Sequence, residues 1–537
     1  MRHKSLIYGL LGLFACASGA WGAESASPGT PRRSVEELAV RIDFFIDEGL
    51  KAHGAKAVEL ADDATFLRRV YLDIAGRIPS VAEVRAFLDD PSPNKRRELV
   101  DRLLDGPYYV RHFSAVWRSQ ILPAGANTQF QFVNPTFENW LQNKLRDNVP
   151  YDQMVRELLT VSVNPNAVPG RVEAMQAAYF AFAPLAFYQA NEMKPENLAA
   201  SVSRMFLGVK LECAQCHDHP FAPWKRQQFW EFAAFFAGIR PQNANNGFIA
   251  APESPDRREL TIPGTDKTAR ARFLDGSEPR WAKGVSTRAI LADWLVAPDN
   301  PFFARTAANR LWAHFFGIGL IDPVDEPGDD NPPSHPELLD ELAQQLVLHN
   351  FDLKYLIRAI TASKTYQRSS TTVGAPENPR LFGRMLLKGL TPEQLYDSLV
   401  QATGVREGGS YERIVAFNTA GGRADFLNKF ASLDKPTETE TSILQALTLM
   451  NGRFIAEATD LNRSELLAAV LDAPFLDTPS KRIETLFLAT LSRKPRDEEL
   501  TRLVRYVEEG GPKGDARAAL ADIFWALLNS PEFRLNH

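Results

Sequence analysis

Helix start signals recur along nearly the whole chain, and they limit its possible folds more than any other feature. Ser34 with Glu37, and Ser80 with Glu83, form capping boxes, in which each pair satisfies free backbone groups at a helix start. Thr391–Gln394 repeats this pattern, with a proline at the first helical position. The sequence therefore predicts a mainly α-helical protein.

The apolar residues behind these signals follow the helical repeat. Asn300 followed by Pro301 predicts the start of another helix, which Gly317 is suited to end. After the first capping box, one face of the predicted helix carries Val35, Leu38, Ile42, Phe45 and Ile46. A helix with one apolar face buries it against a neighbour, so we expect globular helices that share cores.

The helical pattern breaks between residues 239 and 284, where Pro, Gly and Asn interrupt any helical period. Residues 259–262 and 271–274 are the only plausible strands, and we expect them to form a small hairpin. The sequence therefore predicts two helical domains, at residues 34–238 and 285–537, joined by this irregular segment.

The first residues are typical of a secretory signal, with a charged start at Arg2–Lys4, an apolar run at Leu6–Ala15 and small residues after it. We expect residues 1–23 to be removed and the mature protein to be periplasmic or at the cell envelope. No later stretch approaches the roughly twenty apolar residues that a membrane span needs. Leu13–Cys16 also resembles a lipoprotein box, in which Cys16 would carry a lipid anchor; otherwise Cys16 leaves with the signal.

The charge of the chain argues against a nucleic-acid partner. The formal net charge is −5, and the Lys and Arg residues are spread along the sequence without a basic block. Binding to nucleic acid or to an anionic membrane depends on a concentrated basic surface. We therefore expect no nucleic-acid partner.

The clearest chemical motif is the pentapeptide Cys213-Ala-Gln-Cys216-His217. Thiols at this spacing can add across the two vinyl groups of a haem while the following histidine binds the iron. Without Cys16, these are the two cysteines of the mature chain, so disulfides are no general means of stabilisation here. The motif therefore predicts covalent haem c, with Cys213 and Cys216 as anchors and His217 as the iron ligand.

Three other chemistries remain open for this motif. Cys213 and Cys216 could form a local disulfide or a redox-active dithiol, or could bind zinc together with His217 or His219. No βαβ pattern surrounds the motif, which argues against a thioredoxin-like dithiol. No second cysteine pair is present to complete a zinc site, so its remaining ligands would come from distant residues.

A second axial ligand for the iron is not evident from the sequence. His219 is too close to His217 in the chain to reach the opposite face of a haem, which leaves Met193, Met205, His112 or an open position. The aromatic residues after the motif could surround a porphyrin or could simply be core. They are Phe221, Trp224, Phe229, Trp230, Phe232, Phe235 and Phe236.

An acidic loop at residues 322–331 lies between His314 and His335 and could hold a hard cation or a general base. It lacks the EF-hand spacing, so solvated carboxylates are the simpler interpretation. His314 lies on an apolar helix and is more typical of a hydrogen-bonded core histidine. The chain has neither a G-x-S-x-G elbow nor a phosphate loop, so whether it is an enzyme stays open.

Several segments resemble the planctomycete and verrucomicrobial exported proteins whose two halves are domains of unknown function 1549 and 1553. Leu67–Gly76 and Leu207–Phe221 are similar to the opening and the hallmark of the first domain. Blocks similar to the second domain are Asn309–Gly317, Phe351–Lys354, Leu390–Leu395 and Leu527–Phe533. The resemblance covers nearly all of the mature chain.

The resemblance implies a label more than a mechanism, because both domains are named for sequence and have no settled activity. The first is also called a cytochrome-like domain on account of its cysteine motif. Many relatives carry a separate cytochrome c domain, which this chain lacks, so a redox role would need a partner protein such as a separate cytochrome. Two alternatives are a non-catalytic envelope binding or structural protein, with the motif as a zinc or disulfide clip, and an enzyme related to polysaccharides.

Overall fold

The computed structural model describes residues 30–122, 134–163, 183–220, 222–239, 253–328, 330–404, 422–430, 437, 450 and 452–537. These residues form a mainly helical protein, as the sequence predicts. The predicted signal and Cys16 lie outside the described residues.

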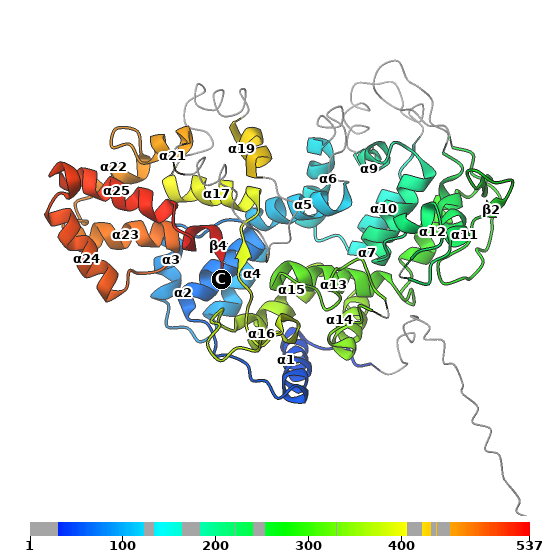
Figure 1. Cartoon of the computed structure of the whole chain (residues 1–537), viewed down its shortest axis with the longest axis horizontal. Helices are drawn as coiled ribbons and strands as arrows, with labels where there is room; N and C mark the ends of the chain where they lie inside the picture. Colours follow the sequence, from blue (N-terminus) through cyan, green and yellow to red (C-terminus); the bar gives the residue numbers. More distant parts are fainter. Residues whose placement is uncertain are drawn as a thin grey trace, which may run out of the picture.

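The helices of the first half begin with α1 and end before the hairpin (Figure 1). They are α1 (Val35–Ala52), α2 (Asp63–Val70), the π-helix η1 (Tyr71–Ala75), α3 (Val81–Leu88), α4 (Lys95–Leu104), α5 (Pro107–Ile121), α6 (Asn134–Arg146), α7 (Tyr151–Thr160), α9 (Leu185–Ala190), α10 (Pro195–Leu207), the 3-10 helix η4 (Glu212–Gln215), α11 (Arg226–Ala233) and η5 (Ala234–Phe236).

The second half is also built from helices, with one short strand near its middle and another at its end. Its elements are α12 (Thr287–Leu295), α13 (Phe303–Phe316), α14 (Pro336–Leu348), α15 (Leu353–Ala362), α16 (Lys364–Gln367), η6 (Pro379–Leu381), β3 (Lys388–Gly389), α17 (Pro392–Thr403), α19 (Gly422–Phe430), α21 (Arg453–Ala458), α22 (Glu465–Asp472), α23 (Pro479–Leu491), α24 (Asp497–Glu508), η7 (Gly511–Lys513), α25 (Ala516–Leu528), η8 (Glu532–Arg534) and β4 (Leu535–Asn536).

The predicted capping boxes are confirmed. At the start of α1, Ser34 Oγ accepts a hydrogen bond from Glu37 N, and the Glu37 carboxylate accepts one from Ser34 N. The boxes that begin α3 and α17 have the same reciprocal bonds. Gly317 ends α13 in the left-handed conformation, as its position in the sequence predicts. These ends form because local side chains satisfy backbone groups that the helix itself cannot.

The predicted hairpin is present, but its second strand was misplaced. β1 (Glu259–Thr261) pairs with β2 (Thr268–Arg270) in an antiparallel register that joins Leu260 to Ala269. Residues 271–274 follow β2 instead of forming it, because Phe273 turns into the core and stacks on Phe235 and Trp294 at centroid distances of 5.1 and 4.7 Å.

A second small sheet has no signal in the sequence. β3 pairs antiparallel with β4, which brings Lys388 opposite Asn536. Each strand has only two residues, and the two strands are separated by most of the second half of the chain. Because alternation cannot be read from two residues, only the tertiary structure shows this pairing.

The helices do not pack in chain order. In Figure 1, α22–α25 form one end, α10–α12 and the hairpin form the other, and the N-terminal helices α1–α5 lie between them beside α13–α16. One large apolar cluster includes residues of both halves, and a second joins residues of η1 to helices near the C-terminus. The core is therefore shared across the irregular segment that separates the halves in sequence.

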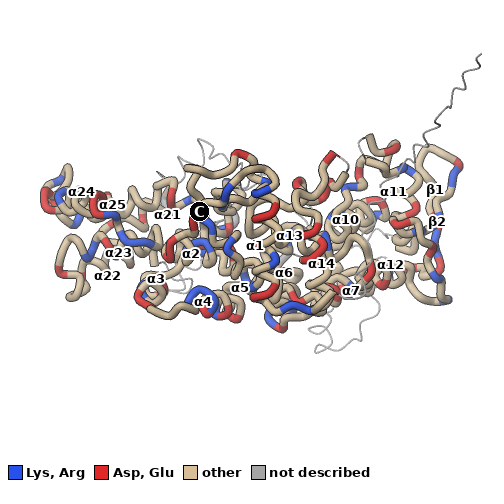
Figure 2. Tube along the Cα trace, turned by 90° about the horizontal axis from the view of Figure 1, so that it is seen from below, with Lys and Arg blue, Asp and Glu red and all other residues tan. Residues whose placement is uncertain are grey.

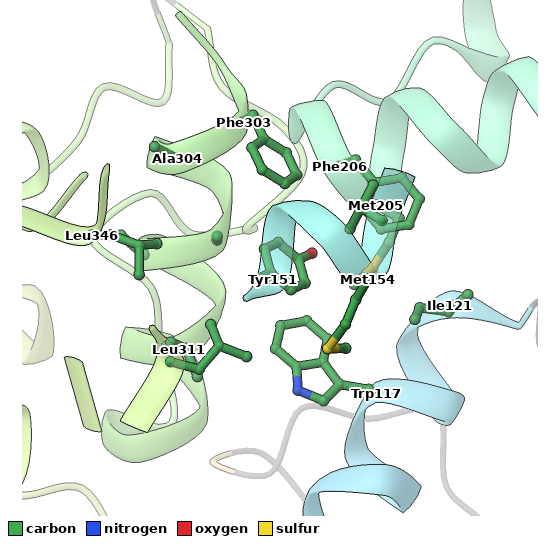
Figure 3. Close-up of a cluster of buried hydrophobic side chains, with 14 of the residues drawn as sticks. Trp117, Ile121, Tyr151, Met154, Met205, Phe206, Phe303, Ala304, Leu311 and Leu346 are labelled. Atoms are coloured by element: carbon green, nitrogen blue, oxygen red, sulfur yellow. The ribbon is translucent and has the colours of Figure 1, made fainter. Parts of the chain in front are cut away.

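Figure 3 shows part of this shared core, where side chains of α5, α7 and α10 meet those of α13 and α14. Tyr151 of α7 stacks on Phe303 of α13 with ring centroids 5.3 Å apart and also packs against Trp117 of α5. Such aromatic pairs add to the free energy gained from apolar burial.

Charged residues of both signs are interspersed along the molecule (Figure 2). Within the described ranges, no helix combines the length and apolar character that crossing a membrane requires.

Candidate functional site

The cysteine motif lies on a tight turn after α10. Gly208 ends α10 in the left-handed conformation, and a Cβ atom there would lie 2.7 Å from Thr306 Oγ1, so this position requires glycine. The chain then forms η4, in which Ala214 is fully buried while Cys213 and the following Cys216 are exposed. Burial of Ala214 therefore anchors the turn and leaves both thiols at the surface.

The start of α11 holds the other side of this turn. The carbonyl of Gln215 accepts hydrogen bonds from Arg226 Nε at 3.3 Å and from Trp230 Nε1 at 3.0 Å. The Asp218 carboxylate accepts the backbone N–H of Arg226 at 2.9 Å and pairs with Lys225 at 3.2 Å. These contacts lower the pKa of Asp218 below its usual value, chiefly through the Arg226 N–H. No local pattern in the sequence indicates these contacts, although helix N-termini commonly bind carboxylates.

His217 has one ring nitrogen engaged by the backbone. Its Nδ1 lies 2.7 Å from the carbonyl oxygen of Asp218. A carbonyl only accepts hydrogen bonds, so Nδ1 carries the proton in the neutral ring and the lone pair is on Nε2. Metal-binding histidines are commonly oriented by such a bond from their other nitrogen. The exposed His217 ring is therefore held in a tautomer that can bind a metal through Nε2.

His219 is held differently. Its ring Nδ1 accepts the backbone N–H of Ala222 at 2.9 Å, and the backbone N–H of His219 donates to the carbonyl of Trp224 at 2.8 Å. Burial lowers the pKa of its ring below the usual value. Because the Nδ1 lone pair is used within the loop, His219 acts here to close the turn that follows the motif.

The three candidates for a second axial ligand do not lie on the exposed face of the motif. Met193, Met205 and His112 are all buried in the core. Met205 points into the cluster around Trp117 (Figure 3), and the His112 ring packs against His314 with centroids 5.6 Å apart. The structure therefore does not bring any of these side chains to the motif.

The aromatic residues that follow the motif are mostly core. Phe229, Phe232, Phe235 and Phe236 are fully buried, and Trp230 is nearly so. Their rings pack on one another and on the segment after the hairpin. Phe221 lies outside the described residues. Simple core packing therefore accounts for these four phenylalanines.

The acidic loop of the second half lies directly beside the motif. The carbonyl of Asp325 accepts the backbone N–H of Lys210 at 3.0 Å, and Glu326 pairs with the Lys210 side chain at 2.6 Å. Asp329 lies outside the described residues. The sequence placed this loop and the motif in different domains, whereas the structure brings them together. In the part of the chain that the structure describes, no group of three or more His, Cys, Asp or Glu residues could hold a metal ion.

His314 and His335 have hydrogen-bond partners other than this loop's carboxylates. His314 is a hydrogen-bonded core histidine, with Nε2 2.8 Å from the carbonyl of Asp73. His335 is buried beside Ser334, and burial lowers its pKa to about 4. The structure therefore gives neither histidine a place in a cation site.

The donor set of the motif fits covalent haem. Both thiols are accessible, and the imidazole has the tautomer that an iron ligand needs. Two cavities, of about 770 and 560 Å³, lie elsewhere, one between the start of α2 and the loop that precedes α24 and the other at the hairpin. Cys213, Cys216 and His217, all exposed, are the residues that would hold a haem at this turn.

Both halves of the chain match family models. Residues 41–241 match PSCyt2, described as a protein of unknown function (DUF1549), and residues 287–425 and 425–507 match PSD1, described as a protein of unknown function (DUF1553). No curated protein and no solved structure matches the chain.

Proposed function

Since this chain consists of a PSCyt2 (DUF1549) domain followed by a PSD1 (DUF1553) domain, we propose that it is an exported c-type haem protein with a redox role at the cell envelope. Cys213 and Cys216 attach the haem, and His217 binds its iron. The supporting observation is the hydrogen bond from His217 Nδ1 to the Asp218 carbonyl, beside two exposed thiols.

Each residue of the motif has a separate task. Cys213 and Cys216 would each hold the haem through a thioether, because a thiol can add its sulfur and hydrogen across a vinyl double bond without a leaving group. The Asp218 carbonyl keeps the proton of His217 on Nδ1 and so keeps Nε2 available. Haem bound in this way supplies a one-electron iron couple. The buried Ala214 and the Gln215 carbonyl fix the turn on which these groups stand.

The exposed position of the motif favours electron transfer with another protein. A redox centre near the surface allows close approach of a partner, and both thiols of the motif are exposed. We therefore propose a separate cytochrome as the redox partner. Export through residues 1–23 would bring this chain to the compartment where cytochrome c maturation takes place.

The test is an absorption spectrum of protein exported from a host with a working cytochrome c maturation system, followed by a haemochrome assay after denaturation. We expect a Soret band and haem that stays attached on denaturation. Cys216→Ala should lose at least one thioether bond, and Cys213→Ala with Cys216→Ala should lose all attached haem. Gln227→Ala, an exposed change on the neighbouring helix α11, is the matched control. A colourless protein from this host would refute the proposal.

A second candidate is a non-catalytic envelope protein in which Cys213 and Cys216 form a clip. Its support is that both thiols are exposed, because an oxidising compartment joins accessible neighbouring thiols. A colourless protein whose mass is two hydrogens below that of the reduced chain would favour a disulfide clip. Stoichiometric zinc in the colourless protein would favour a metal clip.

A further inference from the structure

The helical segment α2–η1 carries three charged side chains that are almost completely buried. Arg68, Arg69 and Asp73 are at most 1% exposed. All three belong to the first half of the chain, but their side chains bind residues of the second half. Buried charges are rare unless they are paired, so these contacts decide whether the segment can be buried at all.

The two arginines bind backbone carbonyls of the second half, most of them near the C-terminal end of the chain. Arg68 donates to the carbonyls of Thr490 at 2.9 Å and of Phe533 at 2.8 Å. Arg69 donates to the carbonyl of His537 at 3.1 Å and to that of Tyr366. Each guanidinium therefore joins two segments of the second half to one helix of the first.

Asp73 is surrounded by donors from the second half. Its carboxylate accepts hydrogen bonds from Lys388 Nζ at 2.6 Å, from Asn536 Nδ2 at 2.7 Å and from the Tyr366 hydroxyl at 2.8 Å. Lys388 also donates to the carbonyls of His314 and Phe315 at the end of α13. The β3–β4 pairing places Lys388 and Asn536 opposite each other, so both reach the same carboxylate.

The backbone of the π-helix is also satisfied by the second half. The Gln394 side chain donates to the carbonyl of Leu72 at 2.9 Å, and His314 Nε2 binds the carbonyl of Asp73 at 2.8 Å. A π-helix is rare and is found mostly as a single turn at functionally important positions. Here two of its carbonyls and its only carboxylate bind side chains from five separate elements, α13, α16, α17, β3 and β4.

Apolar residues of the same segment depend on the second half as well. Leu72 and Ile78 are fully buried in a cluster whose other core members lie at residues 395–533. Phe66 packs edge-on against Tyr366 at a centroid distance of 6.5 Å. Removing the second half would expose these apolar side chains beside three charges, and the π-helix would lose its partners.

We propose that α2–η1 is the docking element that makes the two halves one obligate folding unit, and that the second half remains its bound partner when the chain between them is cut. The partner surface is built from the ends of α13 and α23, the start of α17, the short helices α16 and η8 and the β3–β4 pair. This inference does not depend on haem, because the residues involved lie outside the motif.

The experiment uses the full chain with a protease site inserted after Gly284, which is exposed and has no neighbouring atom within 4 Å of a Cβ position. The folded protein is cut, and gel filtration reports whether the two pieces stay together. Pulse proteolysis in urea with mass spectrometry then reports the unfolding midpoint of each piece separately. We expect the pieces to elute together and to share one midpoint. Pieces that separate without denaturant, or that unfold at clearly different midpoints, would overturn the proposal.

Two variants test the docking element itself. Asp73→Asn should lower the shared midpoint of both pieces, and Tyr366→Phe, which removes only one hydroxyl contact, should lower it less. Glu157→Gln is the control, because Glu157 pairs with Trp140 and Lys144 inside the first half and is partly exposed. If Tyr366→Phe and the control gave equal shifts, or if Asp73→Asn moved the midpoint of one piece only, α2–η1 would not be the docking element.

Discussion

The cysteine motif and the Asp73 cluster are assembled in opposite ways. The motif occupies consecutive positions from Cys213 to His217, its reactive side chains are exposed, and its supports come from the helix that follows. The Asp73 cluster is buried and draws its members from both halves of the chain. In the motif, the reactive side chains lie together on one local turn. In the Asp73 cluster, contacts between distant segments stabilise the fold.

We therefore expect the motif to determine what the protein binds and the Asp73 cluster to determine whether it folds. Substitutions in the motif should change what the protein binds and leave its fold intact, since exposed side chains contribute little to stability. Substitutions around Asp73 should unfold the protein, because a buried charge without its partner is costly.

The largest effect is expected for Asp73→Ala, which leaves the Lys388 ammonium buried without a carboxylate. Removing one partner of a buried ion pair typically costs about 3–5 kcal/mol of unfolding free energy. Urea unfolding followed by circular dichroism measures this loss, and Lys388→Met should give a loss of the same order. A loss below about 1 kcal/mol for both variants would mean that the Asp73–Lys388 ion pair contributes no more to stability than an exposed one.

The next largest effect is expected for Gly76→Ala at the end of η1. Gly76 has φ +68°, and a Cβ atom there would lie 2.4 Å from His112 Nδ1. The left-handed conformation and the steric overlap together should cost about 2–4 kcal/mol. Gly54→Ala is the matched control, because Gly54 has φ +63° and open space around it. It should lose only about 1 kcal/mol in the same urea titration, and equal losses would show that His112 can move aside.

A smaller effect is expected from pH. Burial lowers the pKa of His112 well below 6.5 and that of His314 below 6.5, and it lowers the pKa of His335 and His537 to about 4. Lys388 beside His112 and His314 acts in the same direction, whereas Asp73 opposes it at His314. The unfolded chain therefore binds more protons than the folded one between pH 6.5 and about 4. Stability is complete above pH 6.5 and falls as the pH drops through this window.

Thermal unfolding between pH 8 and pH 4.5 measures this loss, to which each unit of pKa lowering contributes about 1.4 kcal/mol. His112→Gln should flatten the pH dependence, even if it lowers the melting temperature throughout. An unchanged slope in this variant would assign the acid sensitivity to other groups.

The smallest effect on stability is expected at the motif. Cys213→Ser and Cys216→Ser should change the unfolding free energy of the haem-free protein by no more than about 0.5 kcal/mol, because both side chains are exposed. The same variants should lose the covalent haem mass in the intact protein. A large loss of stability in the haem-free variants would mean that the motif also has a structural role.

The sequence by itself determined the helices and the chemical motif. Capping at Ser34, Ser80 and Thr391 involves residues three positions apart, and the motif spans five consecutive positions, so neighbouring residues suffice to define both. The hairpin was found for the same reason, although core packing of Phe273 displaced its second strand.

Only the tertiary structure decided which distant segments meet. Asp73, Lys388 and Asn536 carry no local pattern, and the β3–β4 pair is too short to show one. The sequence also did not predict that the acidic loop lies next to the motif. Nor did it predict the burial of Met193, Met205 and His112. Local hydrogen bonds and periodicity depend on residues that are close in sequence, so the sequence predicts them. The burial of a charge depends on partners that lie hundreds of positions away in the chain, so only the tertiary structure shows it.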